Sequence, residues 1–114
     1  MIEHGPYVLD NSEKIHVNNY TITKFASVFY LDNPVGTGFS FVDDSRAFRT
    51  NEDDVAEDLL TVITTLIGEA FPEYSNSPIF ITGESYAGKY IPYVASLILK
   101  KKGSWTSKVV AIIF

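Results

Sequence analysis

The chain contains no cysteine at all. This absence excludes disulfide bonds, a thiolate nucleophile and any metal site that uses cysteine ligands. Histidine is scarce as well, because His4 and His16 are the only two in the sequence. No apolar run approaches the length that crosses a membrane, and Met1 leads directly into polar residues without the apolar core of a signal peptide. We therefore expect no membrane partner.

Positive charge is also in short supply. The formal net charge is −5, with 9 basic against 14 acidic residues, which argues against nucleic acid as a partner. All of the acidic residues lie at or before Glu84, and only lysines carry charge after Ser85. Among these, Lys100, Lys101 and Lys102 are typical of the solvated C-terminus of a helix.

What the chain has in quantity is apolar sequence. Hydrophobic residues make up 46% and aromatic residues 14% of the 114 residues, as in a globular protein with a buried core. This length predicts a single small domain over residues 1–114. The apolar runs at residues 25–31, 79–82 and 108–114 predict buried strands. Residues 7–9 are a short apolar piece, and residues 15–23 predict an exposed strand or an extended segment. We expect the run at 25–31 to be a central strand, buried on both faces.

Two further segments predict helices. The first begins near Asn51, where Thr50 or Asn51 can cap it, has acidic residues in its first turn and ends at Pro72. Its apolar residues form two neighbouring rows at helical spacing: Val55, Leu59, Val62, Leu66 and Ala70, and then Ala56, Leu60, Ile63 and Ile67. The second helix is expected to kink at Pro92 and to run to about Lys102, with Gly103 as its C-terminal cap.

The alternation of strands and helices predicts an α/β fold. Parallel strands joined by helices form a mostly parallel sheet with flanking helices, which is a three-layer arrangement. The chain starts without a lead-in to its first strand and stops on a bare hydrophobic strand. We therefore expect a partial domain, truncated at both ends.

The glycine-rich stretch PVGTGFSF follows one predicted strand. A G-x-G after a strand suggests nucleotide binding, but the dinucleotide fingerprint needs a third glycine and an immediate helix. Phe39 and Phe41 intervene here, and no Gly-Lys-Ser/Thr follows. Gly36 and Gly38 are more simply interpreted as positions where the backbone turns sharply beside another element.

The stretch ITGESYAGKY is the strongest chemical signal, because it places a serine between an apolar strand and a helix. Its pattern is G-x-S-x-A-G, in which Gly83, Ala87 and Gly88 are small residues around Ser85. A nucleophile elbow requires small residues there, since strand and helix backbones approach closely. The N–H of Tyr86 would then point at the oxyanion of a tetrahedral intermediate. The alternative is a serine that merely caps the helix in a strand-to-helix turn.

Five ordered motifs, EHGP, LDNPVGTGFSF, NEDDVAEDL, FPEY and GESYAGKYIP, extend over most of the chain. Together they resemble the serine carboxypeptidases, a branch of the α/β-hydrolases, and most closely the vitellogenic-like carboxypeptidase group. The resemblance implies a partial α/β-hydrolase fold and release of C-terminal residues from peptides through an acyl-enzyme, with no metal and no organic cofactor.

Carried over by position, the resemblance implies that Ser85 is the nucleophile and that the Tyr86 N–H is an oxyanion donor. It implies that Glu84 and Glu3 bind the terminal carboxylate of a peptide substrate. Two carboxyl groups and a substrate carboxylate cannot all ionise cheaply at one site, so activity is expected to favour acidic pH. It also implies a secretory, lysosome-like or extracellular location, with Asn19 of the N-x-T sequon as a glycosylation site.

The sequence departs from the family pattern after the serine. The catalytic Asp and His should follow the nucleophile, but no Asp, Glu or His follows Ser85. A serine hydroxyl is a weak nucleophile without its base, so we expect the 114-residue chain alone to be inactive. For His4, which lies within EHGP, we favour a structural or pocket-lining role over that of the base. Two alternatives remain: an esterase or acyltransferase of the same fold, and a non-catalytic remnant that acts as a binding module.

Overall fold

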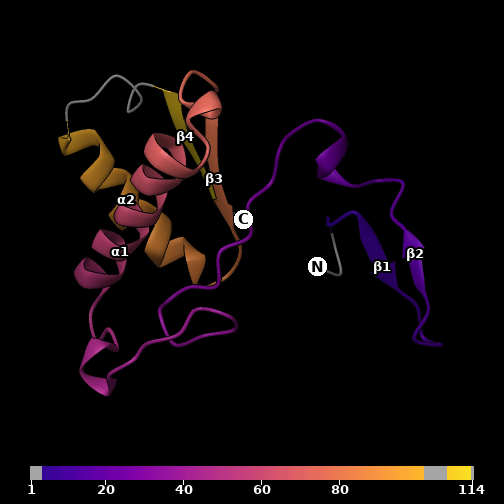
Figure 1. The fold of residues 1–114 in the computed structure, drawn as a ribbon, viewed down its shortest axis with the longest axis horizontal. Coiled ribbons are helices and arrows are strands. Elements are labelled where there is room, and N and C mark those ends of the chain that lie inside the picture. Colours follow the sequence, from indigo (N-terminus) through magenta and orange to yellow (C-terminus); the bar gives the residue numbers. More distant parts are fainter. Residues whose placement is uncertain (1–3, 102–107, 114) are drawn as a thin grey trace. The chain divides into compact units, whose positions relative to one another are not determined.

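The computed structural model describes residues 4–101 and 108–113, and for 111–113 the backbone only. The chain divides into two compact units, Met1–Leu31 and Asp32–Phe114. Each unit has its own strands, and Figure 1 labels them β1 and β2 in the first unit and β3 and β4 in the second. The helices α1 and α2 belong to the second unit. In the described residues no helix has the length and hydrophobicity that crossing a membrane requires.

The first unit is built on a β-hairpin. Strand β1 (Tyr7–Leu9) pairs antiparallel with β2 (Ile15–Val17). The Asp10 carboxylate accepts hydrogen bonds from two backbone N–H groups of the connecting turn, at 2.8 and 2.9 Å, and contacts the His16 ring at 2.6 Å. These bonds, of which the one from the Lys14 backbone has the largest effect, hold the pKa of Asp10 below its usual value. Of residues 15–23, predicted as an exposed strand or extended segment, only Ile15–Val17 form a strand, which is exposed, and a 3₁₀-helix follows at Ile22–Lys24.

The predicted central strand at 25–31 does not form. These residues have no strand assignment, and Phe25 is 89% and Phe29 58% exposed. A strand needs a neighbour that satisfies its backbone N–H and C=O groups, and within the described residues only the β1–β2 and β3–β4 pairs occur. An apolar run alone therefore did not establish a strand here.

The first predicted helix is confirmed. Helix α1 (Glu52–Thr65) begins after Asn51, whose side chain accepts a 2.9 Å hydrogen bond from the N–H of Asp54. The chain continues as a π-helix at Leu66–Ala70, and Pro72 starts a separate 3₁₀-turn, as the sequence predicted for the end of the helix. Only the N-terminal half of its apolar rows is fully buried, namely Val55, Ala56 and Leu60.

The second unit is a strand–helix–strand arrangement with α1 packed on its helix. Strand β3 (Ile79–Gly83) pairs in parallel with β4 (Val109–Ile113), and α2 (Ala87–Lys100) connects them along the chain. Helix α2 contains Pro92 and ends at Lys100, with Lys101 as its C-cap, whereas it was predicted to run to about Lys102; Lys102 and Gly103 lie outside the described residues. The core lies between the two helices and one face of the strand pair, and it is formed by Ala56, Leu60, Val94 and Ile98.

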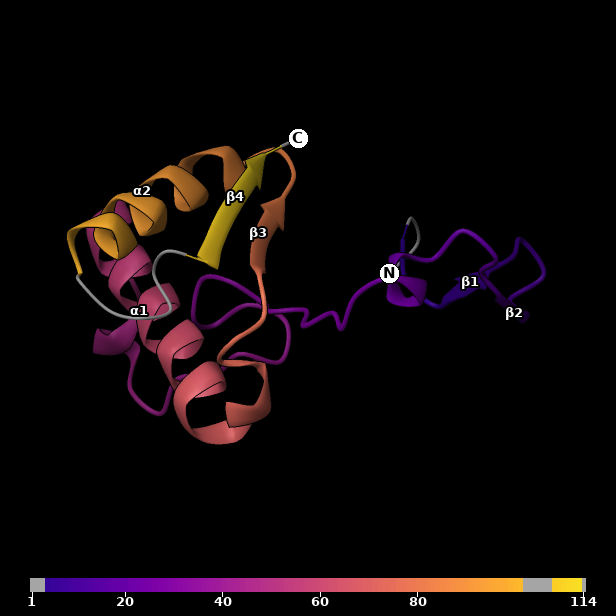
Figure 2. The same ribbon diagram turned by 90° about the horizontal axis from the view of Figure 1, so that it is seen from above.

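Among the described residues, helices cover one face of the strand pair. Figure 2 shows α1 and α2 on the same side of β3 and β4. On β3 the burial alternates, so that Ile81 packs against the core while Phe80 on the opposite face is 58% exposed. The α/β class is confirmed, but β3, which the sequence predicted as a buried strand, is half-buried.

Candidate active site

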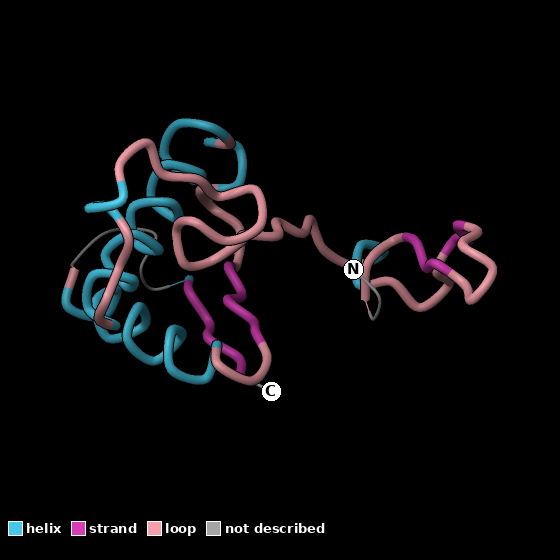
Figure 3. Tube along the Cα trace, turned by 90° about the horizontal axis from the view of Figure 1, so that it is seen from below, coloured by secondary structure: helices cyan, strands magenta, loops and turns pink. Residues whose placement is uncertain are grey.

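A short loop joins β3 to α2 (Figure 3). Ser85 lies in this loop, and its backbone is left-handed. Its φ is +57°, one of two positive values at non-glycine residues among the described residues. For a residue with a Cβ this region costs about 1–3 kcal/mol, so the surrounding structure has to hold it there. The turn closes tightly, because Ala87 N–H donates to Glu84 C=O at 3.1 Å and Gly88 N–H to Ser85 C=O at 2.9 Å.

The backbone of β3 and the start of α2 approach closely at Gly83. A Cβ built on Gly83 would lie 2.5 Å from the Cβ of Ala87 and 3.2 Å from Cδ1 of Ile91. The end of the strand and the start of the helix thus approach closer than any side chain allows. Ala87, which replaces the second glycine of the G-x-S-x-G pattern, is the other member of this contact.

Two polar groups of the turn have no hydrogen-bond partner within the described part of the chain. The Ser85 hydroxyl and the Tyr86 N–H are both without a hydrogen bond there, and Ser85 is exposed. No side chain caps α2, whose N-cap residue is Tyr86. The interpretation of Ser85 as a helix cap is therefore wrong. A free N–H at a helix N-terminus beside an exposed hydroxyl can bind an anion or a developing oxyanion.

The side chain of Tyr86 is held from three directions. Its hydroxyl donates a 2.8 Å hydrogen bond to Oε1 of Glu52, the first residue of α1. Its ring meets the Tyr90 ring edge-to-face, with centroids 5.1 Å apart. The Nζ of Lys89 lies 5.1 Å from the Tyr86 ring centroid, within cation–π range.

An open cleft of about 200 Å³ lies beside this tyrosine pair. It is lined by Pro34, Arg49, Thr50, Asn51, Glu52, Val55, Tyr86 and Tyr90. Burial raises the pKa of the Tyr90 hydroxyl, and the negative charge of Glu52 raises it further. The second oxygen of Glu52, Oε2, is buried and has no hydrogen-bond partner among the described residues.

The loop before α1 forms one wall of the cleft through Pro34, which follows a cis Asn33–Pro34 peptide. Gly36 and Gly38 have φ of +87° and +54°, and a Cβ on Gly38 would overlap the carboxylate of Asp32. That carboxylate accepts a 2.8 Å bond from the N–H of Phe39. The prediction that both glycines turn the backbone beside another group is confirmed.

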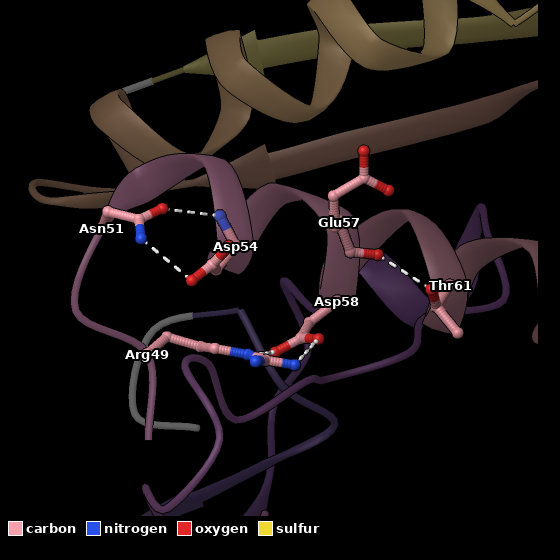
Figure 4. Close-up of polar contacts among 6 residues, drawn as sticks. All are labelled: Arg49, Asn51, Asp54, Glu57, Asp58 and Thr61. Atoms are coloured by element: carbon pink, nitrogen blue, oxygen red, sulfur yellow. Dashed lines mark hydrogen bonds and ion pairs between the residues drawn. The ribbon is translucent and has the colours of Figure 1, made fainter. Parts of the chain in front are cut away.

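The first turns of α1 form a second wall, fixed by polar contacts that Figure 4 shows. The guanidinium of Arg49 donates two hydrogen bonds to the Asp58 carboxylate, at 2.6 and 2.7 Å. This pairing raises the pKa of Arg49. Because the bidentate pair joins the loop to the helix, it fixes the direction in which the chain enters α1.

Comparison with known proteins identifies the family to which the chain belongs. A family model described as "Serine carboxypeptidase" matches residues 1–111. The chain belongs to the serine carboxypeptidase family. The human "Probable serine carboxypeptidase CPVL" is 48% identical over 97 residues, which are 85% of this chain and 20% of that protein.

Other relatives in the serine carboxypeptidase family have different names. The "Venom serine carboxypeptidase" of Apis mellifera is 40% identical over 97 residues, which are 85% of this chain and 21% of that protein. The "Pheromone-processing carboxypeptidase KEX1" of Podospora anserina is 45% identical over 109 residues, which are 94% of this chain and 18% of that protein. The chain thus spans about a fifth of the length of the curated relatives that it matches. The family implies an α/β-hydrolase fold, with which the α/β arrangement of the second unit is consistent.

Most of the residues predicted from the serine carboxypeptidase resemblance lie in one turn. Gly83, Glu84, Ser85 and Tyr86 run from the end of β3 to the start of α2, and Gly88 lies in the first turn of α2. Glu84 is exposed beside Ser85.

The other predicted residues belong to the N-terminal part of the chain. Glu3 lies outside the described residues, and Asn19 is exposed in the first unit. His4 stacks on Tyr30 of its own unit, with ring centroids 5.5 Å apart and a 3.1 Å hydrogen bond, which supports the structural role that the sequence favoured.

Sequence reasoning missed Glu52 and Tyr90. Glu52 was interpreted as one of three acidic residues that favour a helix N-terminus, and no local pattern distinguishes it from Asp53 and Asp54. Its partner Tyr86 is 34 positions away, so only the packing of α1 against α2 brings the two together.

In the described residues no group of three His, Cys, Asp or Glu side chains could hold a metal ion.

The contact at Gly83 generates a test of stability. Gly83→Ala is expected to lower the free energy of unfolding by about 1–3 kcal/mol, because the added methyl overlaps Ala87. Denaturant unfolding followed by circular dichroism measures the change. Gly68→Ala is the matched control, since a Cβ there meets nothing within 4 Å and the substitution should be neutral or stabilising. Equal effects at both glycines would contradict the close approach.

A second test concerns the charge of Glu52. Because its carboxylate raises the pKa of the Tyr90 hydroxyl, Glu52→Gln should lower that pKa toward the ordinary value of tyrosine. Tyrosinate absorbance during an alkaline titration reports the change, and Tyr90→Phe assigns the transition. Asp53→Asn removes a charge from the same helical turn and should have a smaller effect. If both variants titrate alike, the interaction is not specific to Glu52.

Proposed function

We propose that this chain is the nucleophile-bearing part of a serine-type carboxypeptidase, an enzyme that releases C-terminal residues from peptides. The observation that supports this most is the left-handed backbone of Ser85 at a strand-to-helix turn whose neighbours approach as closely as Gly83 and Ala87 do. Membership of the serine carboxypeptidase family gives this geometry its chemical meaning. A strained turn of this kind presents the serine hydroxyl at the end of the sheet.

In the proposed reaction, Ser85 Oγ attacks the carbonyl carbon of the last peptide bond. The hydroxyl proton passes to a base, and the carbonyl oxygen becomes an oxyanion that the Tyr86 N–H binds. The C–N bond then breaks, the released amino acid takes the proton, and an acyl-enzyme ester remains on Ser85. Water hydrolyses this ester and returns the serine.

The substrate's terminal carboxylate is the feature that an exopeptidase has to recognise. Glu84 is exposed and adjacent to Ser85, so it is placed within the turn that meets the scissile bond. We assign it, with Glu3, to binding that carboxylate through a proton shared among the carboxyl groups. A protonated carboxyl donates the hydrogen bond, whereas two ionised ones would repel the substrate.

The base is the missing part of this machinery in the 114 residues. No Asp, Glu or His follows Ser85, and His4 and His16 both belong to the first unit. We therefore propose that the 114-residue chain by itself does not turn over peptides. A serine without its base is too weak a nucleophile at neutral pH.

We assign the second unit to a three-layer α/β-hydrolase sheet within the full-length carboxypeptidase. Phe80 and Val110 are 58% and 44% exposed on the described strands, as expected of positions that a further layer would cover. The exposed Asn19 in its N-x-T sequon supports a glycosylated protein of the secretory pathway, in a lysosome-like or extracellular location.

The nucleophile is tested in the full-length carboxypeptidase that carries this segment. Ser85→Ala should abolish release of the C-terminal residue from a blocked dipeptide, with a loss of at least about 10³-fold in kcat. It should also abolish labelling by a fluorophosphonate probe. Ser96→Ala, at an exposed serine of α2, should leave both unchanged.

The outcome of this test separates the proposed peptidase from its rivals. Turnover of esters or acyl donors without peptide hydrolysis would indicate an esterase or acyltransferase. A full-length protein that shows no labelling and no turnover would indicate a binding module. Turnover by the isolated 114-residue chain would contradict its proposed inactivity.

Carboxylate recognition is tested by the pH dependence of peptide hydrolysis. In the wild-type enzyme kcat/KM should fall as pH rises, because the shared proton is lost and the substrate carboxylate is repelled. Glu84→Gln provides a neutral donor at every pH and should weaken this fall. Glu57→Gln, at an exposed carboxylate of α1, should retain the wild-type profile. An unchanged profile in Glu84→Gln would count against the assignment.

A further inference from the structure

We propose that Glu52 is a positioning residue for the catalytic turn, which it holds through the hydroxyl of Tyr86. This inference rests on the proposed function, in which the Tyr86 N–H binds the oxyanion next to Ser85. Glu52 itself touches neither substrate nor reacting atoms in this assignment. It acts from another helix, through the 2.8 Å hydrogen bond between its Oε1 and the Tyr86 hydroxyl.

The side chain of Tyr86 needs such a contact, because burial does not hold it. Tyr86 is 53% exposed, so packing leaves half of its surface free. Its remaining contacts, the Tyr90 ring edge and Lys89 Nζ, both come from α2, the helix that Tyr86 itself begins. Among the hydrogen-bond, ring and cation–π partners of Tyr86 in the described residues, Glu52 is the one that lies on a different element.

This link matters because the Tyr86 side chain and its N–H are attached to the same Cα. If the ring rotates, the first peptide units of α2 are free to relax, and the adjacent Ser85 can leave its unfavourable left-handed conformation. A bond from α1 opposes that relaxation. Positioning of this kind affects rate strongly, since a shift of about 1 Å in a catalytic group can cost roughly 10²-fold.

The local environment of Glu52 distinguishes it from an ordinary helix-start acid. Asn51 already caps α1, and Asp53 and Asp54 supply negative charge to its first turn. Glu52 instead turns toward the cleft, with Oε2 buried and lacking a hydrogen-bond partner among the described residues. A buried unpaired oxygen is unfavourable for folding and is not needed to stabilise a helix N-terminus.

The experiment is a double-mutant cycle in the full-length carboxypeptidase with a blocked dipeptide. Glu52→Ala and Tyr86→Phe should each lower kcat by roughly 10- to 100-fold with KM little changed, because the N–H binds the oxyanion only in the transition state. The double variant should lose no more than either single variant. Glu52→Gln keeps an oxygen that accepts the hydroxyl bond and should retain most of the wild-type kcat.

Controls and active-site counting separate positioning from folding. Fluorophosphonate labelling gives the fraction of competent serines, so that kcat is expressed per active site even where a variant is unstable. Asp53→Ala removes a carboxylate from the same turn, and Tyr93→Phe removes a hydroxyl from the same helix that has no hydrogen bond in the described residues. Both controls should match the wild type.

Three results would overturn the proposal. The first is an unchanged kcat per active site in Glu52→Ala or Tyr86→Phe. The second is a rise in KM alone, which would place Glu52 in substrate binding. The third is losses that multiply in the double variant, since residues acting through one bond do not add independently. In each case the wild type would still show Ser85-dependent turnover, whereas failure of the proposed function would remove that turnover itself.

Discussion

The close approach of β3 to α2 is the constraint on which the rest of the candidate site depends. Gly83 and Ala87 meet at a separation that leaves no room for a Cβ on Gly83, and the chain must reverse direction within the residues between them. Ser85 lies within this reversal and has a left-handed backbone. In this turn Ser85 is exposed, and the N–H of Tyr86 has no hydrogen bond among the described residues.

A second contact, between α1 and α2, decides what surrounds the turn. Leu60 of α1 and Val94 of α2 are almost completely buried in the shared core, so the two helices are held side by side. The N-terminus of α1 then lies beside the start of α2, and Glu52 reaches Tyr86. The same packing places the Arg49–Asp58 pair and Pro34 around the cleft. The hydrophobic core between α1 and α2 thus determines which polar groups meet at the cleft.

The sequence predicted the second unit well because its signals are local. A capping residue at Thr50 or Asn51, an acidic first turn and two apolar rows are properties of a single helix, and α1 begins within one residue of the predicted position. The strand-turn-serine-helix order likewise needs only neighbouring residues. The run at 25–31 was predicted wrongly, because strand formation depends on a pairing partner that no local pattern reveals. Coverage of the faces of β3 likewise depends on elements distant in the sequence, and in the described residues helices pack on one face.

The sequence by itself determined the family, the two helices, the strands β3 and β4 and the position of the serine between them. These follow from residue types and short spacings, which act through backbone preference and side-chain periodicity. Only the tertiary structure decided that Ser85 is left-handed, that Gly83 admits no side chain, and that Glu52 rather than Asp53 meets Tyr86. Those facts depend on how α1, α2 and β3 pack together, since a hydrogen bond across 34 positions exists only after the chain has folded.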